Sequence, residues 1–462
     1  MITINELVEQ YKTKKRSPQE LIKDLYVEIE KQNPKLNVYL ALDKQQALEQ
    51  AKKITEFNKP LSGVPFAIKD NFCTQDIRTT ASTKVLDNFI PPYDATVISK
   101  LKKNGAIIIG KTNMDAWAHG SSTETSDYGT THNPYDLNRV PGGSSGGSAA
   151  TVASGLPPYS LGTETAGSIR QPAAWCGVVG LKPTYGRASR YGLISMGSSF
   201  DCPGPITRNV EDAALILQII SGYDKFDATS SPKQVPNYLE SLKGKKKLVI
   251  GICDSYLKGV NPSIVKKFEE TMSILKKIGY SFKKIDLIDP SYSISCYTIL
   301  QRAEVSSNLS RYDGIRYGND RTFFAKQAKR RAMLGAFTLS MGYYDAYYLK
   351  AQKVRTLIIN NFKQVFKEVD LILAPTTPTT ALKIGENEKN PMFGEIMDQL
   401  VEASSIAGLP GINIPVGLEN GLPVGMQIFG PWFGEENIIN IAKNYQDETC
   451  FYNIKPQNFY EI

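Results

Sequence analysis

Apolar positions near the start of the chain recur with the period of an α-helix. They form one stripe: Leu21, Ile22, Leu25 and Ile29. Such a stripe is more typical of a core-facing or partner-facing helix than of a catalytic one. The segment 17–20, Ser-Pro-Gln-Glu, has the form of a capping box with proline at the first helical position. We therefore expect residues 1–60 to form a helical N-terminal region.

From residue 61 to 222 the pattern changes to short apolar runs between loops rich in glycine, serine and proline. Phe-Ala-Ile at 66–68 opens directly after Pro65, and Ala-Ile-Ile-Ile occupies 106–109. Runs of this length and composition are typical of buried strands. We expect this segment to carry the active site.

The rest of the chain continues to mix the two patterns. Strands are expected at 248–252, at 371–375 and within 410–430, and a helix at 263–277. Residues 295–367 read as mostly helical, and we expect this region, with its tyrosine-rich part above all, to cover a substrate pocket. There is no internal repeat. The pattern as a whole indicates an α/β fold.

Composition excludes several classes of protein. The chain has 462 residues, 41% of them hydrophobic, without an apolar run of the roughly 20 residues that a membrane span needs. The N-terminus lacks a secretory pattern. Six cysteines are scattered without C-x-x-C spacing, which favours reduced thiols of a cytoplasmic protein over a zinc site or disulfides. The net charge of +8 reflects lysines that most simply lie on solvated faces.

Two serines flanked by glycine stand out as candidate nucleophiles. Ser144 lies in Gly-Gly-Ser-Ser-Gly-Gly-Ser at 142–148, and Ser168 in Gly-Thr-Glu-Thr-Ala-Gly-Ser-Ile-Arg at 162–170. Glycine lets the backbone approach a ligand closely and exposes amide N–H groups, as a nucleophile beside an oxyanion hole requires. The first motif also matches the G-x-S-x-G elbow of α/β-hydrolases, whose histidine follows the serine in the chain.

Histidine is an improbable base for either serine. The chain has only His119 and His132, and neither follows Ser144. The α/β-hydrolase order is therefore impossible, and both histidines lie in loop-like contexts. Lysine is the known substitute in Ser-Lys hydrolases. Lys69, at the end of an apolar strand, is the best candidate, because burial brings the pKa of a lysine toward neutrality. A lysine that reaches solvent from a strand end is the plainer interpretation of Lys69 alone.

Taken together, Lys69, Ser144 and Ser168 in these contexts resemble the amidase signature family, and the resemblance covers nearly the whole chain. It implies a single large α/β domain with a mixed central β-sheet surrounded by helices. It also implies a Ser-cis-Ser-Lys triad, with Ser168 as nucleophile, Ser144 as the bridging serine after a cis peptide, and Lys69 as base. The implied oxyanion hole is the backbone of Thr165, Ala166, Gly167 and Ser168, where the family usually has glycine at position 166.

Further stretches resemble one branch of this family, the glutaminase subunits of tRNA-dependent amidotransferases. They lie at 120–124, 178–187, 307–314, 330–331, 342–348 and 407–411. Free glutamine carries a carboxylate and an ammonium group, so its site needs a fixed cation and a fixed anion. The resemblance assigns these roles, together with pocket-lining positions, to Arg331, Asp398, Tyr297, Ser121 and Ser122. Where the branch usually has threonine three residues after the aspartate, this chain has Val401.

The same resemblance implies a reaction and its partners. The chain would hydrolyse glutamine without a metal or cofactor of its own. The ammonia would pass to the B subunit of an amidotransferase, which uses ATP and Mg²⁺ to convert Glu-tRNA(Gln). The C subunit would complete the heterotrimer, and the chain would contact tRNA only as part of that complex. The alternatives are a stand-alone amidase acting on another small amide and a catalytically silent scaffold. The scaffold is disfavoured because all three triad positions carry the residue types that catalysis requires.

One further motif matches a nucleotide-binding pattern. Residues 105–112, Gly-Ala-Ile-Ile-Ile-Gly-Lys-Thr, fit the P-loop expression G-x-x-x-x-G-K-[ST] letter for letter. A P-loop needs its middle residues to form an anion-cradling loop, whereas these are apolar and mostly β-branched. We interpret the segment as a strand and the match as accidental.

Overall fold

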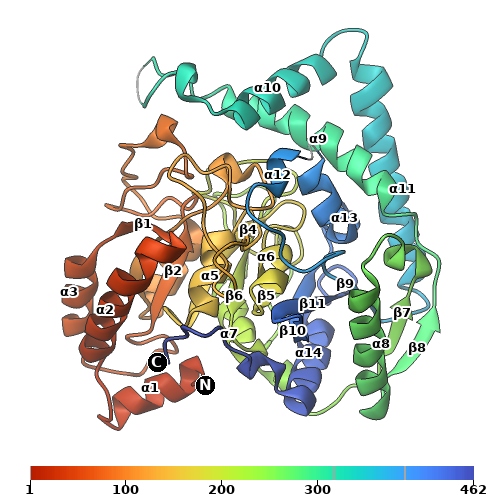
Figure 1. Cartoon of the computed structure of the whole chain (residues 1–462). Coiled ribbons are helices and arrows are strands. Elements are labelled where there is room, and N and C mark those ends of the chain that lie inside the picture. The colour runs from red at the N-terminus through yellow and green to blue at the C-terminus, as the bar shows by residue number, and fades with distance from the viewer. Residues whose placement is uncertain (1, 316–317, 390–391, 462) are drawn as a thin grey trace.

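The computed structural model describes residues 2–315, 318–389 and 392–461. Within this part of the chain, eleven strands form one sheet in the order β1-β3-β2-β4-β6-β5-β10-β11-β9-β7-β8, which runs through the centre of the molecule (Figure 1). The strands are β1 (Tyr39–Leu42), β2 (Pro65–Lys69), β3 (Ile107–Thr112), β4 (Tyr159–Glu164), β5 (Val179–Lys182), β6 (Cys202–Thr207), β7 (Val249–Ile252), β8 (Ser281–Lys284), β9 (Leu371–Pro375), β10 (Gly411–Glu419) and β11 (Leu422–Phe429).

The sheet is mixed, as expected. Strand β2 runs parallel to β3 and β4, and β7 runs parallel to β8 and β9. The other neighbouring strands are antiparallel. The α/β architecture is therefore confirmed.

Helices surround this sheet (Figure 1). They are α1 (Ile4–Lys12), α2 (Pro18–Leu36), α3 (Lys44–Lys53), α4 (Thr96–Lys103), α5 (Gly146–Ala153), α6 (Arg170–Trp175), α7 (Val210–Ile220), α8 (Pro262–Lys277), α9 (Ser291–Leu309), α10 (Lys326–Thr338), α11 (Lys350–Val365), α12 (Glu386–Lys389), α13 (Phe393–Ile406) and α14 (Glu435–Thr449). Helix α10 extends over the top of the molecule in Figure 1, beside α9 and α11.

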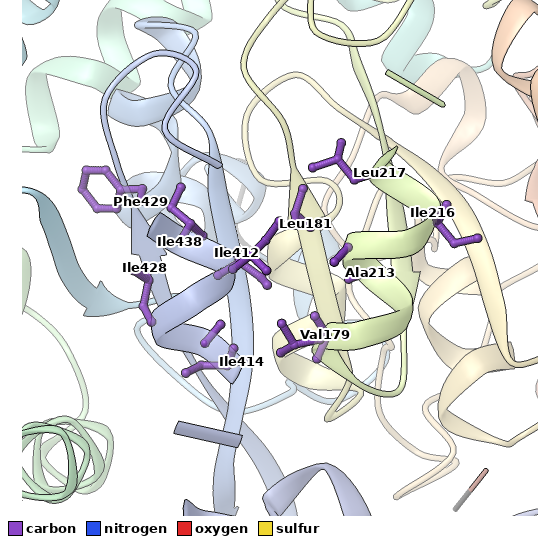
Figure 2. Packing of buried hydrophobic residues seen from close by; sticks show 14 of the residues in the cluster. Val179, Leu181, Ala213, Ile216, Leu217, Ile412, Ile414, Ile428, Phe429 and Ile438 are labelled. Carbon is purple, nitrogen blue, oxygen red and sulfur yellow. The ribbon is translucent and has the colours of Figure 1, made fainter. Parts of the chain in front are cut away.

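Both faces of the central strands are buried, which explains their continuous apolar runs. Successive side chains of a strand point to opposite faces. Accordingly, Phe66 and Ile68 belong to one hydrophobic cluster, and Ala67 between them belongs to another that includes residues of α5. Figure 2 shows the first cluster, where side chains of α7 pack on β5 and those of β10 and β11 pack beside Ile438 of α14.

The N-terminal region is helical, as the apolar stripe predicts. All four stripe residues of α2 are fully buried. The capping box is confirmed, because Glu20 N donates to Ser17 Oγ at 3.2 Å and Ser17 N donates to Glu20 Oε2 at 2.8 Å. One element was not expected: strand β1 follows α2 and pairs with β3 at an edge of the sheet.

The other strand and helix predictions are confirmed with small shifts of their ends. Strand β9 spans the expected residues, and β10 and β11 fill the expected final segment. The P-loop match is a strand, because the Gly-Lys-Thr at its end belongs to β3. There Lys111 is buried and its Nζ donates to Thr79 Oγ1 at 2.6 Å and to the carbonyl oxygen of Phe72 at 2.7 Å.

Candidate active site

Lys69 ends β2 and points into the protein. Its Nζ donates to Ser144 Oγ at 2.7 Å, to Ser145 Oγ at 2.8 Å and to the carbonyl oxygen of Thr163 at 3.2 Å. The side chain is completely buried. The interpretation of Lys69 as a lysine that reaches solvent is therefore wrong.

Burial also changes the charge of this lysine. It lowers the pKa of Lys69 to about 7, although three buried carboxylates oppose the shift: Asp115, Asp201 and Glu164. Near neutral pH a large fraction of the amine is uncharged and able to accept a proton from a neighbouring hydroxyl.

Ser144 lies in a turn that precedes α5. The peptide bond between Gly143 and Ser144 is cis, as the family resemblance implies. The Ser144 hydroxyl contacts Lys69 and is fully buried. The next residue, Ser145, was not predicted as part of the site, yet its hydroxyl makes the second contact with Lys69. The only sequence signal for it is its adjacency to Ser144.

Ser168 lies two residues before α6 and lines a pocket. Its carbonyl oxygen accepts a hydrogen bond from Ser145 N at 3.2 Å, which joins the loops of the two candidate catalytic serines. Its hydroxyl makes no hydrogen bond to a described residue, so it is available to a ligand in the pocket. The proton relay from Ser168 to Ser144 stays a prediction.

The backbone N–H groups of residues 165–168 are the candidate anion site. None of these four N–H groups donates to another residue of the described ranges. Glu164 holds the following turn, because its Oε2 accepts from the backbone N of Ile169 and of Arg170, both at 3.0 Å. Ala166 is not among the described residues with a positive φ, so the alanine in place of the family's glycine introduces no backbone strain of that kind.

Ser168 shares its pocket with most of the residues expected to bind substrate. The pocket has an empty volume of about 360 Å³. It is lined by Ala118, Gly120, Ser121, Thr165, Ser168, Met196, Tyr297, Thr298, Gln301, Arg331, Gly394, Glu395, Asp398 and Glu402. Ser122 is not among these lining residues, and its role in binding substrate stays a prediction. Its backbone N donates instead to Asp115 Oδ2 at 3.2 Å.

Asp398 and Arg331 each keep a polar atom without a partner in this pocket. Asp398 Oδ2 accepts from Ser121 Oγ at 2.6 Å, whereas Oδ1 is buried without a hydrogen bond. Burial raises the pKa of Asp398 to about 8. Arg331 Nη1 donates to Gln301 Oε1 at 2.9 Å, and its Nε is unpartnered.

Tyr297 extends from α9 to the loop 165–168, and its hydroxyl lies 2.8 Å from Thr165 Oγ1. Arg331 comes from α10, so the region 295–367 does contribute to the pocket. The prediction that its tyrosine-rich part covers the pocket is wrong in detail. None of residues 343–348 lines it, and three tyrosines of that segment, Tyr343, Tyr344 and Tyr347, are exposed.

Some pocket residues were missed by the sequence analysis. Gln301 lies one turn after Tyr297 on α9, and Glu402 lies one turn after Asp398 on α13. Their spacing of four residues from Tyr297 and Asp398 is the sequence signal that indicates them, because positions four apart share a helix face.

Neither histidine contacts the candidate triad. His132 Nδ1 lies 2.6 Å from the carbonyl oxygen of Leu137. His119 is buried between two pocket-lining residues, and burial lowers its pKa well below the usual value. Within the described ranges, no group of His, Cys, Asp or Glu residues could hold a metal ion, and no helix is long and apolar enough to cross a membrane. All six cysteines are free.

For the glutamine hydrolysis that the family resemblance implies, the environment of Lys69 predicts how kcat at saturating substrate depends on pH. The protonated amine cannot act as a base, so kcat should rise with pH through about 7 and level off above it. At pH 6 we expect kcat to be about tenfold below the plateau. Initial rates of ammonia release between pH 5.5 and 9 measure this. A profile that stays flat across this range would contradict a lysine base.

Comparisons with known proteins identify the family of this chain. The sequence pattern of the Amidase family matches residues 20–439. The chain is 48% identical to the A subunit of glutamyl-tRNA(Gln) amidotransferase from Sulfurihydrogenibium sp., with 98% of this chain and 99% of the relative covered. It is 46% identical to the protein of the same name from Carboxydothermus hydrogenoformans, with 99% of each covered. The crystal structure of the Thermotoga maritima counterpart superposes with a TM-score of 0.86 at 37% identity, covering 100% of this chain and 98% of that one. Matches of this extent show that the chain belongs to the Amidase family, the amidase signature enzymes that its motifs resemble.

Proposed function

We propose that this chain is the glutaminase subunit of a tRNA-dependent amidotransferase. The observation that carries the proposal is the single pocket that joins the Ser168 hydroxyl to a fixed cation, Arg331, and a fixed acid, Asp398. Glutamine needs all three, whereas an amide without charged groups needs only the first. The names of the relatives support the same function.

The substrate would be oriented by its two charged groups. Arg331 binds the α-carboxylate, for which a guanidinium provides two parallel donors. Asp398 binds the α-ammonium through Oδ1, the oxygen that Ser121 leaves free. In the empty pocket burial keeps this carboxyl protonated, and the arriving ammonium supplies the positive charge that lowers its pKa again.

The chemistry follows from the relay behind the pocket. Neutral Lys69 takes a proton from Ser144, and Ser144 takes one from Ser168, whose Oγ attacks the side-chain amide carbon of glutamine. The free N–H groups of residues 165–168 stabilise the oxyanion, and loss of one such donor typically costs about 3–4 kcal/mol. Ser144 then protonates the leaving nitrogen. Ammonia departs, and water hydrolyses the γ-glutamyl ester on Ser168.

The remaining steps belong to partners. We propose that the amidotransferase subunits B and C complete a heterotrimer in the cytoplasm, where the B subunit uses ATP and Mg²⁺ to convert Glu-tRNA(Gln) to Gln-tRNA(Gln). This chain supplies the nitrogen and contacts the tRNA only as part of the complex. A stand-alone amidase is the second candidate, and co-purification of the two partners with this chain separates the two functions.

Replacing Arg331 with methionine tests the proposal. We expect Arg331→Met to lower kcat/KM for glutamine by about 100-fold or more, because the substrate carboxylate loses its guanidinium partner. Amidation of Glu-tRNA(Gln) with added ammonia should persist, since that route bypasses the pocket. The matched control is Arg330→Met, which removes the exposed neighbouring arginine. Unchanged use of glutamine by Arg331→Met would contradict the proposed function.

A further inference from the structure

Helix α13 lines the pocket with three acids, Glu395, Asp398 and Glu402. Asp398 and Glu402 are four residues apart, so their side chains lie on the same face of the helix, one turn from each other. Both are buried, and both line the pocket that contains Ser168. The proposed function uses only Asp398, which leaves Glu402 without a role.

Two of these acids each have one oxygen atom without a hydrogen bond. They are Asp398 Oδ1 and Glu402 Oε2, both fully shielded by protein. A third acid of the same helix, Glu395, differs because Arg302 Nη2 donates to its Oε1 at 2.8 Å. Buried polar atoms are normally paired, so two unpaired acceptors in one pocket indicate a ligand with several donors.

We propose that Glu402 is a specificity-determining residue that binds the α-ammonium group of glutamine together with Asp398. This inference rests on the proposed function and goes beyond it, because it makes the ammonium subsite a pair of acids. An ammonium group has three N–H donors, whereas Asp398 offers it one unpartnered oxygen, Oδ1. Glu402 Oε2 supplies a second acceptor from the next turn of the same helix.

The charges around Glu402 agree with this role. Burial raises the pKa of its carboxyl well above the usual value, and the neighbouring acids Asp398 and Glu395 raise it further. Two arginines, Arg302 and Arg331, act in the opposite direction. Tyr297 and Cys296 of α9 also lie within electrostatic reach. A substrate cation between the two carboxyl groups therefore lowers both pKa values and favours their charged, accepting forms.

The test compares glutamine with glutaric acid monoamide, which keeps the carboxylate and the side-chain amide but lacks the ammonium group. The ratio of kcat/KM values for the two amides measures recognition of the ammonium. In the full chain with its co-purifying partners, we expect Glu402→Gln to lower this ratio by roughly 10- to 100-fold, the range for a lost hydrogen bond to a charged group. The value for the monoamide itself should change little.

Two further variants make the result specific. Glu402→Asp keeps the charge on a shorter side chain and should retain part of the preference for glutamine. Glu436→Gln, on α14 and outside the pocket lining, should leave the ratio at the wild-type value. An equal loss with both amides in Glu402→Gln would show a purely structural role and overturn the inference.

The outcomes also separate this inference from the proposed function. A wild-type chain that does not prefer glutamine to the monoamide contradicts the glutaminase assignment and the subsite with it. A wild-type preference that Glu402→Gln retains in full contradicts only the role of Glu402.

Discussion

Replacing Ser168 with alanine is expected to reduce glutamine hydrolysis by roughly 10⁵- to 10⁶-fold, the loss seen when a serine nucleophile is removed from a triad. The reason is positional. Ser168 is the candidate serine that lines the substrate pocket, whereas the Ser144 hydroxyl is fully buried against Lys69. Ammonia release by the purified variant measures the loss, and a thermal unfolding curve confirms that the variant is folded.

Covalent labelling distinguishes the nucleophile from the relay. A glutamine-like electrophile should add its mass to Ser168 in the wild-type chain and leave Ser168→Ala unlabelled. Ser144→Ala is the matched variant, because it keeps the nucleophile but interrupts the path to Lys69. Its labelling should be slow rather than absent. Label found on Ser144 or on a cysteine would contradict the assignment of Ser168.

The sequence predicted those parts of the site that local pattern determines. The apolar run before Lys69 predicts a buried strand, although Lys69 alone favoured a lysine that reaches solvent, and the glycines around Ser144 and Ser168 predict loops with exposed hydroxyl groups. The helix stripe and its capping box were predicted for the same reason, since each depends on residues within one turn of each other.

Residues whose role depends on packing between distant elements could not be predicted in this way. Glu402 and Gln301 line the pocket because α13 packs on α9, so helical spacing indicates them only once Asp398 and Tyr297 are placed in that pocket. Residues 39–42 form strand β1 because they pair with the edge of β3. Aromatic composition does not show which side of a helical layer faces the pocket, and the tyrosines Tyr343, Tyr344 and Tyr347 are exposed.

A buried ion pair connects the loop 165–168 to the rest of the protein. Arg170 is completely buried, and its Nη2 lies 2.6 Å from Glu164 Oε1. The same guanidinium donates to Gln427 Oε1 of β11 at 2.7 Å and to Ser405 Oγ of α13 at 2.9 Å. Since Glu164 in turn holds the backbone N of Ile169, one arginine ties the loop that ends in Ser168 to a strand and a helix.

Replacing Arg170 with methionine should therefore damage both stability and catalysis. The substitution leaves Glu164 buried and unpaired, and removal of one partner of a buried pair costs about 3–5 kcal/mol of unfolding free energy. Urea denaturation measures this, and ammonia release should fall because the donors of residues 165–168 lose their support. The control is Lys12→Ala, which breaks an exposed pair with Glu9 and should cost less than about 1 kcal/mol.

The double variant Glu164→Gln with Arg170→Met identifies the cause of the loss. If the unpaired charge of Glu164 is responsible, the neutral glutamine should recover part of the stability that Arg170→Met alone loses, because no buried charge remains. The rate of ammonia release should not recover, since methionine at position 170 lacks the N–H donors that reach β11 and α13. A double variant as unstable as the single one would instead place the cost in the lost hydrogen bonds of Arg170.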